Sequence, residues 1–335
     1  MATVTDLARL LRTRAELEAL GFIRPGRALD PACFHRVRNG RFVPAAEWAS
    51  LHTEDRHRIE IAAAVEDMGD GEAVLSHDSA AVIWGLPLYR HTPTRVHVST
   101  PPGHLGASSA VVLRHRVELP PEDITIRDGL RVTSLARTAV DVARSLPTEA
   151  ALSCLDAAMA TACVERHEMD PERAELWRQD LRARVAATPG VRGARRARAA
   201  IEFMDGRAQL PGESISRLHL HRLGFAPPRL QVRMTGPKGA WIWIDFGLDD
   251  VRWWGEFDGK GKYSDEAMRA GRTVEEVMYD EKRREDWIRG RTSYGVARWG
   301  SEDIRSIDRF AARLSAFGIH PPSFPASSRR RLILP

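Results

Sequence analysis

The amino-acid sequence predicts a mixed α+β protein that ends in an αβββαβ region. Two dipeptides, Asn39-Gly40 and Asp128-Gly129, stand between alternating residues, which is the strongest short-range signal of a β-hairpin. Helical periodicity and short strand-like runs follow one another through residues 51–205. Beyond residue 206, a helical segment, three β-rich runs, a charged helix and a fourth strand succeed each other. We therefore expect a helix–hairpin front, an α/β middle region and a C-terminal αβββαβ domain.

The composition is that of a globular chain with a modest basic excess. A length of 335 residues with 43% hydrophobic residues is sufficient for two or three domains with buried cores. The net charge of +5 and the pI of about 9.4 favour a polyanionic partner, with DNA as the first expectation. The three cysteines, Cys33, Cys154 and Cys163, form neither a CxxC zinc motif nor the paired pattern of a disulfide framework. No apolar run is long enough to cross a bilayer, and Met1–Arg14 lacks the apolar block of a secretory signal, so we expect a cytoplasmic protein without a membrane partner.

Residues 1–50 have the pattern of a winged helix-turn-helix. The segments Thr3–Leu11 and Thr13–Leu20 each predict a helix, and Asp30 is expected to cap a third one. The Asn-Gly hairpin that follows would form the wing. Three arginines on this wing are expected to contact DNA phosphates: Arg36, Arg38 and Arg41. The alternative is a small helical cap that packs on the next domain.

The middle region, residues 51–205, shows no phosphate-binding glycine loop, no nucleophile elbow and no metal-ligand cluster, so a structural role is expected for it. It ends in a helical connector rich in arginine, which suits phosphate contacts because its planar fork donates two hydrogen bonds at once. Three residues of the connector are expected to bind nucleic acid: Arg192, Arg195 and Arg196. The alternative is an ordinary solvated helix face in a chain that uses arginine in place of lysine.

Acidic residues interrupt two apolar strand-like runs in the last third of the chain. Asp245 lies in one run, and Glu256 and Asp258 lie in the next. Burying a carboxylate in an apolar strand is costly unless a cation compensates its charge. Across a hairpin that turns near residues 249–250, Asp245 and Glu256 would be near neighbours, and Glu256 and Asp258 would share a face. We therefore expect the three acids to converge and to bind Mg²⁺ or Mn²⁺, which prefer oxygen ligands.

Further charged residues surround these acids. Glu213, near the start of the preceding helix, would supply a fourth acid to the site. Lys260 and Lys262 follow Asp258 closely, so Lys260 is expected to assist catalysis and Lys262 to contact nucleic acid. The domain is expected to cover residues 206–317 and to be followed by a tail, residues 318–335.

This C-terminal pattern has a known counterpart. The order αβββαβ, with Ile244-Asp245-Phe246 followed by Gly255-Glu256-Phe257-Asp258-Gly259, resembles the PD-(D/E)XK nuclease superfamily, in its branch near the very-short-patch mismatch repair endonucleases. The likeness covers about residues 210–310 and implies a restriction-endonuclease-like fold with Mg²⁺-dependent cleavage of DNA. The superfamily usually has lysine two residues after the second acid, whereas this chain has Asp258 two residues after Glu256. An Asp-x-Lys pattern does occur two residues later, as Asp258-Gly259-Lys260. The alternative is a degenerate nuclease fold that binds DNA without cutting it.

The front of the chain has a second resemblance. Thr13–Gly21, the basic hairpin and Ser76–Leu86 resemble the AbiEi-like antitoxin of abortive-infection, or type IV toxin–antitoxin, systems. This resemblance implies a DNA-binding regulator with a cognate toxin as partner. Two functions are therefore open: a metal-dependent DNA endonuclease in phage defence or in DNA repair with a repair partner, or a non-catalytic regulator.

Overall fold

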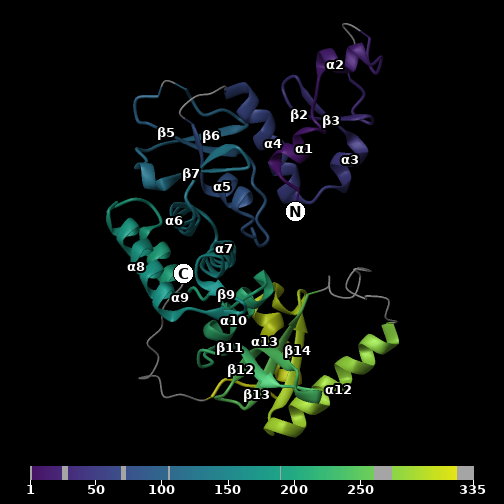
Figure 1. Cartoon of the computed structure of the whole chain (residues 1–335), viewed down its shortest axis with the longest axis vertical. Coiled ribbons are helices and arrows are strands. Elements are labelled where there is room, and N and C mark those ends of the chain that lie inside the picture. Colours follow the sequence, from purple (N-terminus) through teal and green to yellow (C-terminus); the bar gives the residue numbers. More distant parts are fainter. Residues whose placement is uncertain are drawn as a thin grey trace. The chain divides into compact units, whose positions relative to one another are not determined.

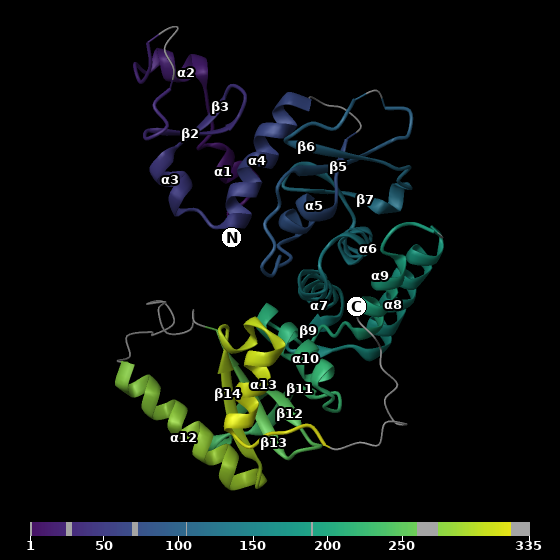
Figure 2. The same cartoon turned by 180° about the vertical axis from the view of Figure 1, so that it is seen from behind.

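The computed structural model describes residues 2–24, 29–68, 73–104, 106–188, 190–259 and 274–322. Contacts divide the chain into two compact units, each made of two chain segments. Unit 1 comprises Met1–Cys154 with Glu175–Glu202, and unit 2 comprises Leu155–Ala174 with Phe203–Pro335. Figure 1 and Figure 2 draw the elements of both units from two opposite sides. The mixed α+β class predicted from the sequence is confirmed.

Two short helices open unit 1, and each begins with a capping box. Helix α1 (Val4–Ala8) follows Thr3, and α2 (Arg14–Ala19) follows Thr13. In each box, the threonine and the acid three residues later exchange side-chain to backbone hydrogen bonds, which satisfy N–H groups that the first helical turn leaves free. The first two predicted helices are therefore confirmed, with shorter bounds.

A three-stranded antiparallel sheet in the order β1-β3-β2 accompanies these helices. Its strands are β1 (Arg12–Thr13), β2 (Phe34–Arg38) and β3 (Arg41–Pro44). The predicted hairpin turn is present, but only Gly40, with a φ of 73°, takes the left-handed conformation, and Asn39 does not. The register of the β2–β3 pairing shifts between Arg36 and Arg38, so the hairpin departs from regular pairing close to its turn.

The third helix expected after Asp30 does not form. The Asp30 carboxylate accepts a hydrogen bond from the backbone N–H of Ala32 at 2.9 Å, and the Asp30 carbonyl accepts one from Cys33 at 3.0 Å. These bonds close a single turn, because β2 already begins at Phe34, where it pairs with Pro44. Asp30 therefore caps a turn in place of a helix. The winged-helix assignment of residues 1–50 stays a prediction.

The rest of unit 1 contains a five-stranded mixed sheet in the order β6-β5-β4-β8-β7. Its strands are β4 (Val74–Leu75), β5 (Val96–Thr100), β6 (Val112–Arg116), β7 (Ile124–Arg127) and β8 (Leu130–Thr133). The pairs β4–β8 and β5–β6 are parallel, and the pairs β4–β5 and β7–β8 are antiparallel. Asp128 and Gly129, with φ of 50° and 76°, form the predicted hairpin turn between β7 and β8.

The front and the middle region share one hydrophobic core. The helices that follow α2 are α3 (Ala45–Ser50), α4 (Thr53–Met68), α5 (His77–Trp84), α6 (Leu135–Ser145), α7 (Thr148–Cys163), α8 (Pro171–Ala186) and α9 (Ala194–Phe203), with a 3₁₀ turn η1 (Pro121–Asp123). Leu7 and Val43 of the front are buried in the same cluster as Ile59 of α4 and Val98 of β5. A domain boundary at residue 50 would cut through this core, so the two regions form one folded unit.

Unit 2 contains the predicted element order αβββαβ. Its main elements are α10 (Pro211–Leu223), β11 (Arg229–Thr235), β12 (Trp241–Leu248), β13 (Trp253–Asp258), α12 (Val274–Thr292), β14 (Gly295–Gly300) and α13 (Ile307–Ala316). Short elements accompany them: β9 (Val164–Glu165), β10 (Glu168–Met169), η2 (Pro237–Gly239) and η3 (Asp303–Arg305). The sheet order is β11-β12-β13-β14, with antiparallel pairing up to β13 and a parallel last pair.

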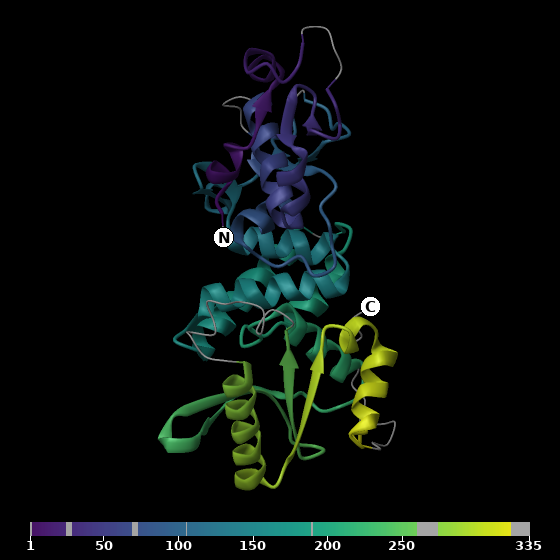
Figure 3. The same cartoon turned by 90° about the vertical axis from the view of Figure 1, so that its right-hand side faces the viewer.

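Helices cover both faces of this sheet, as Figure 3 shows for α12 and α13. On one face, Trp299 packs against Phe246 and against Phe310 of α13, with ring-centroid distances of 5.4 and 5.2 Å. On the other face, Ile288 of α12 belongs to a buried cluster with side chains of β12 and β13. Gly255 is required for this packing, because a Cβ at that position would lie 2.2 Å from the Trp299 ring. The acids of β12 and β13 therefore lie between two packed layers.

Candidate functional site

A hydrogen-bonded group of polar side chains surrounds Asp245 in the sheet of unit 2. Asp245 Oδ2 accepts a hydrogen bond from the backbone N–H of Phe257 at 2.9 Å. Gln231 of β11 donates from its amide nitrogen to Asp245 Oδ1 at 3.2 Å and to Glu213 Oε2 at 3.1 Å. Glu213 Oε2 also accepts the backbone N–H of Gln209 at 2.9 Å. One amide group thus joins an acid of α10 to an acid of β12.

The backbone at this point departs from a regular sheet. The ladder between β12 and β13 pairs Phe246 with Gly255, and no pair of Asp245 with Glu256 continues it. Gln231 lies between the paired residues Leu230 and Val232 of β11, and its φ of 47° falls in the left-handed region that residues with a side chain rarely adopt. Such strained residues concentrate at functional sites. Here the strained conformation accompanies an amide that bridges two carboxylates.

Glu256 of β13 is buried, with 8% exposure, and carries two ion pairs. Its Oε1 lies 2.6 Å from Nη1 of Arg284 on α12, and its Oε2 lies 3.2 Å from Nη2 of Arg298 on β14. Burial raises the pKa of Glu256, the two arginines oppose this rise, and the negative charge of Asp245 adds to it. The charge of Asp245 therefore acts on Glu256, and the cross-strand neighbourhood expected for the two acids stays a prediction.

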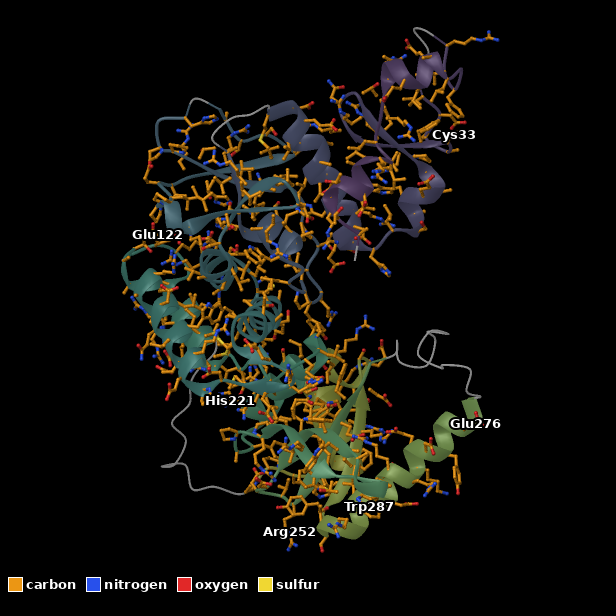
Figure 4. All side chains as sticks on the ribbon, viewed as in Figure 1. Cys33, Glu122, His221, Arg252, Glu276 and Trp287 are labelled. Atoms are coloured by element: carbon orange, nitrogen blue, oxygen red, sulfur yellow. The ribbon has the colours of Figure 1, made fainter. Side chains whose placement is uncertain are left out.

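Helix α12 carries Arg284 and is fastened to the sheet. Trp287, which is labelled in Figure 4, donates from its indole nitrogen to the backbone carbonyl of Thr235 at 2.9 Å. Arg284 itself donates to the backbone carbonyl of Trp243 at 2.7 Å. Arg284 therefore contacts both Glu256 and the backbone of β12, and its guanidinium is held at the site.

The predicted metal ligands Asp245 and Glu256 have different hydrogen-bonding and ion-pair partners. Asp245 is linked to Glu213 through the bridging amide, whereas Glu256 is held by arginines. Asp258 is half-buried in the last position of β13. Within the described residues, no three of these carboxylates bring their oxygens within 4.8 Å of one another, so the expected convergence of three acids on one point is not seen. Two further predicted residues lie outside the described part of the chain: Lys260 and Lys262.

Sequence reasoning missed three residues of this site: Gln231, Arg284 and Arg298. Gln231 alternates with apolar residues, as any strand residue on a polar face does, and nothing in the sequence marks its left-handed backbone. Arg284 stands in a helix so rich in charge that no single residue is distinguished. Arg298 offers a usable signal, because a cation inside the apolar run Val296–Trp299 requires a buried partner as much as Asp245 does.

The three hairpin arginines have different surroundings in unit 1. Arg38 pairs with Asp67 at 2.9 Å, and Arg41 pairs with Glu66 at 2.9 Å, both acids lying on α4. Arg36 is exposed and donates a hydrogen bond within the hairpin. Arg38 and Arg41 therefore fasten the hairpin to α4, which leaves Arg36 as the exposed arginine of the three.

If the hairpin contacts DNA, we expect Arg36→Ala to weaken binding equally across sequences. The slope of log affinity against log salt should then fall by about 1, because one phosphate contact is lost. Arg41→Ala should leave that slope unchanged and should lower stability by about 1 kcal/mol or less, since it removes a partly exposed ion pair. Affinity for duplex DNA at a series of salt concentrations measures both effects. An unchanged slope for Arg36→Ala would remove the hairpin from the DNA interface.

The arginines of the connector also differ in exposure and in their partners. Arg192 and Arg195 are exposed, whereas Arg196 donates to the backbone carbonyl of Arg144. Elsewhere in the connector, arginines pair with acids, as Arg182 of α8 does with Glu202 of α9 at 2.6 Å. The exposed pair can meet a phosphate without breaking a bond that the structure shows. Contact of the connector with nucleic acid stays a prediction.

The middle region does contain a cluster of side chains that could hold a metal ion, contrary to the expectation from the sequence. Ligand nitrogens of His77, His97 and His115 all lie within 4.8 Å of one another. The three histidines are far apart along the chain, so no spacing motif reveals them. The fold brings them together from α5, β5 and β6.

Residues 72–203 match the model of the AbiEi antitoxin C-terminal domain family. All three clustered histidines lie within this AbiEi-like segment. Two uncharacterized proteins of Mycobacterium tuberculosis, MT2308 of strain CDC 1551 and Rv2248 of strain H37Rv, are each 26% identical to the chain over 276 residues. Each alignment covers 78% of this chain and 94% of the relative.

The AbiEi-like segment confirms part of the resemblance drawn from the sequence. Ser76–Leu86 falls inside it, whereas residues 1–50 and residues 206–317 fall outside. The likeness of Thr13–Gly21 to an antitoxin front therefore stays a prediction. Within the described residues, no helix is long and apolar enough to span a membrane.

Proposed function

We propose that unit 2 is a metal-dependent endonuclease domain that hydrolyses DNA phosphodiesters, in a protein of a toxin–antitoxin, phage-defence or DNA-repair system. One observation carries this proposal: the bridged group Glu213–Gln231–Asp245 adjoins Glu256 where β12 and β13 cease to pair. The resemblance to the PD-(D/E)XK superfamily expects its catalytic acids on these two strands. The element order αβββαβ and the parallel last strand pair support the same assignment.

The donor chemistry of the two acids fits a hard divalent cation. Asp245 and Glu256 offer carboxylate oxygens, which Mg²⁺ and Mn²⁺ prefer, and their mutual repulsion would fall in the presence of a dication. When bound, such a cation supplies Lewis-acid polarisation of a phosphate oxygen.

The remaining residues of the site have separate roles in this proposal. Glu213 and Gln231 hold Asp245 in position through the hydrogen bonds described above. Arg284 and Arg298 would turn from Glu256 to the phosphate, since the planar guanidinium binds phosphate oxygens through two parallel hydrogen bonds. Asp258 and Lys260 are proposed to assist at the end of β13, and Lys262 to contact the DNA backbone.

A second function is favoured by the ion pairs of Glu256. Arg284 and Arg298 already compensate this buried charge without a metal ion, which favours a nuclease fold that no longer cuts. Under this alternative the chain is a regulator that binds DNA through residues 1–50 and a cognate toxin through the AbiEi-like segment. The family match of residues 72–203 supports the toxin partner.

Metal dependence separates the two functions. The full chain is incubated with supercoiled plasmid, single-stranded DNA and mismatched duplex, each with Mg²⁺, Mn²⁺ or EDTA. The nuclease proposal predicts cleavage of at least one substrate with metal and none with EDTA. The variant Asp286→Asn, which changes an exposed acid of α12, serves as control and should cleave like the wild type. Binding of DNA without cleavage under every condition would contradict the nuclease and leave the regulator.

A further inference from the structure

The histidine cluster of unit 1 joins three separate elements. His77 is the first residue of α5, His97 lies in β5, and His115 lies in β6. His115 Nε2 is 3.3 Å from His97 Nδ1, and the rings of His77 and His115 stack with centroids 3.7 Å apart. The ligand nitrogens of all three therefore fit within the reach of a single ion.

The sheet register and a strained residue create this cluster. β5 and β6 are parallel neighbours in which Ser99 pairs with His115, so His97 lies diagonally beside His115 on the same face. The start of α5 is tied to β5, because the backbone N–H of Ser76 donates to the carbonyl of His97 at 3.0 Å. His77 has a φ of 50°, in the left-handed region, so its ring is directed at the cluster by a backbone conformation that costs free energy.

A buried carboxylate, that of Asp141, lies next to His77 of the cluster. Asp141 of α6 is 3% exposed, and its Oδ2 lies 3.9 Å from His77 Nδ1. That oxygen accepts no hydrogen bond within the described structure, whereas Oδ1 of Asp141 accepts one from Arg137 at 3.0 Å. A carboxylate next to a histidine ligand is the usual outer partner of a zinc site, where it orients the ring and raises its basicity. His77 Nδ1 also lies 3.1 Å from the Ser76 hydroxyl, so Oδ2 of Asp141 is the oxygen left to orient the His77 ring.

The protonation states suit metal binding. Burial lowers the pKa of His77 and of His115 to about 3, with the neighbouring histidines adding to the effect, and it also lowers the pKa of His97. The three imidazoles are therefore neutral near pH 7, which is the form that binds metal ions. All three residues are of intermediate burial.

We propose that His77, His97 and His115 form a binding site for a transition-metal ion of the zinc class, with Asp141 as its neighbouring carboxylate. Imidazole nitrogens select Zn²⁺ and its neighbours over Mg²⁺, Ca²⁺ and Mn²⁺, which take oxygen ligands. Three histidines leave one position of a tetrahedral ion for water or a substrate. The site is chemically distinct from the carboxylates of unit 2 and does not depend on the proposed nuclease activity.

The test uses the full chain after removal of metal with a chelator that is then dialysed away. Titration with Zn²⁺ should saturate at one tight ion per chain and raise the melting temperature by mass action. Co²⁺ should give the visible absorption of a tetrahedral site with nitrogen ligands. A wild-type chain that binds no Zn²⁺ at micromolar concentration overturns the proposal. This test uses only the wild-type chain and therefore does not depend on whether a variant folds.

Variants locate the ion. His115→Ala should abolish tight binding, whereas His52→Ala, which removes an exposed histidine of the same unit, should retain it. Asp141→Asn should weaken binding by about 10- to 100-fold, the usual effect of removing an outer carboxylate. Asp245→Asn should bind Zn²⁺ as the wild type does. A failure of the proposed nuclease site can then be distinguished from a failure of the proposed Zn²⁺ site. Zn²⁺ binding that survives the loss of His115 and of His97 would place the ion elsewhere and contradict the assignment.

Discussion

Replacing Arg217 with alanine is expected to destabilise unit 2 by about 3–5 kcal/mol, because it leaves a buried carboxylate without its counter-charge. Arg217 of α10 donates to both oxygens of Asp156, at 3.0 and 2.9 Å, and Asp156 is fully buried in α7. The Asp156 carboxylate also accepts the backbone N–H of Asp205 at 2.7 Å. Burial raises the pKa of Asp156, and Arg217 is the main influence against that rise.

An exposed arginine–aspartate pair of the same unit provides the control. Arg229 and Asp249 also form two hydrogen bonds, at 2.6 and 2.7 Å, but their side chains are 51% and 48% exposed. Arg229→Ala should therefore cost about 1 kcal/mol or less. Urea unfolding of both variants against the wild type measures the difference. Equal small losses in the two variants would show that the Asp156–Arg217 pair does not hold the two chain segments of unit 2 together.

Acidification is expected to destabilise unit 1 between pH 6.5 and pH 3. The pKa of His77 is lowered from 6.5 to about 3, mainly by burial, with His97 adding to the effect and Asp78 opposing it. Below pH 6.5 the unfolded chain therefore binds a proton that the folded chain rejects, and stability falls as the pH falls. At pH 5 this one histidine accounts for a loss of about 2 kcal/mol, at about 1.4 kcal/mol per pH unit.

Chelator in the buffer keeps this effect separate from metal binding. The midpoint of urea unfolding is measured from pH 7 to pH 5, above the range in which most carboxylates titrate. His77→Gln should show a smaller fall than the wild type, and His52→Gln, at an exposed position, should show the same fall. A wild-type stability that is constant over this range would mean that His77 accepts a proton in the folded protein.

Local signals in the sequence predicted the regular elements well. The helical segment expected after residue 206 forms as α10 (Pro211–Leu223), because proline begins this helix and Gly224, with a φ of 95°, ends it. The helix predicted after Asp30 does not form. The residues from Phe34 onward, which such a helix would need, pair with β3 instead.

The candidate sites depended more on contacts between distant residues. The hairpin that carries Asp245 and Glu256 could be predicted, because the turn between its strands is short, but the ladder stops at Phe246 and Gly255. The acids that bind Arg38 and Arg41 lie on α4, more than twenty residues further along the chain, and no local pattern predicts them. The histidine cluster and the bridging Gln231 likewise arise from sheet order and backbone strain, which a single sequence does not display.

The nuclease proposal is tested most directly by nicking of supercoiled plasmid by the wild type and by Asp245→Asn in parallel. Wild-type protein should nick the plasmid with Mg²⁺ or Mn²⁺ and should melt at a higher temperature when the metal is present. Asp245→Asn keeps the shape of the side chain and removes one charge, so its nicking should fall to the level of the EDTA control. Its metal-free melting temperature should fall slightly, because the amide nitrogen cannot accept one of the two hydrogen bonds that Asp245 receives from Gln231 and Phe257. Equal nicking rates for the two proteins would contradict the account, as would a wild-type protein that neither cuts DNA nor gains stability from either metal.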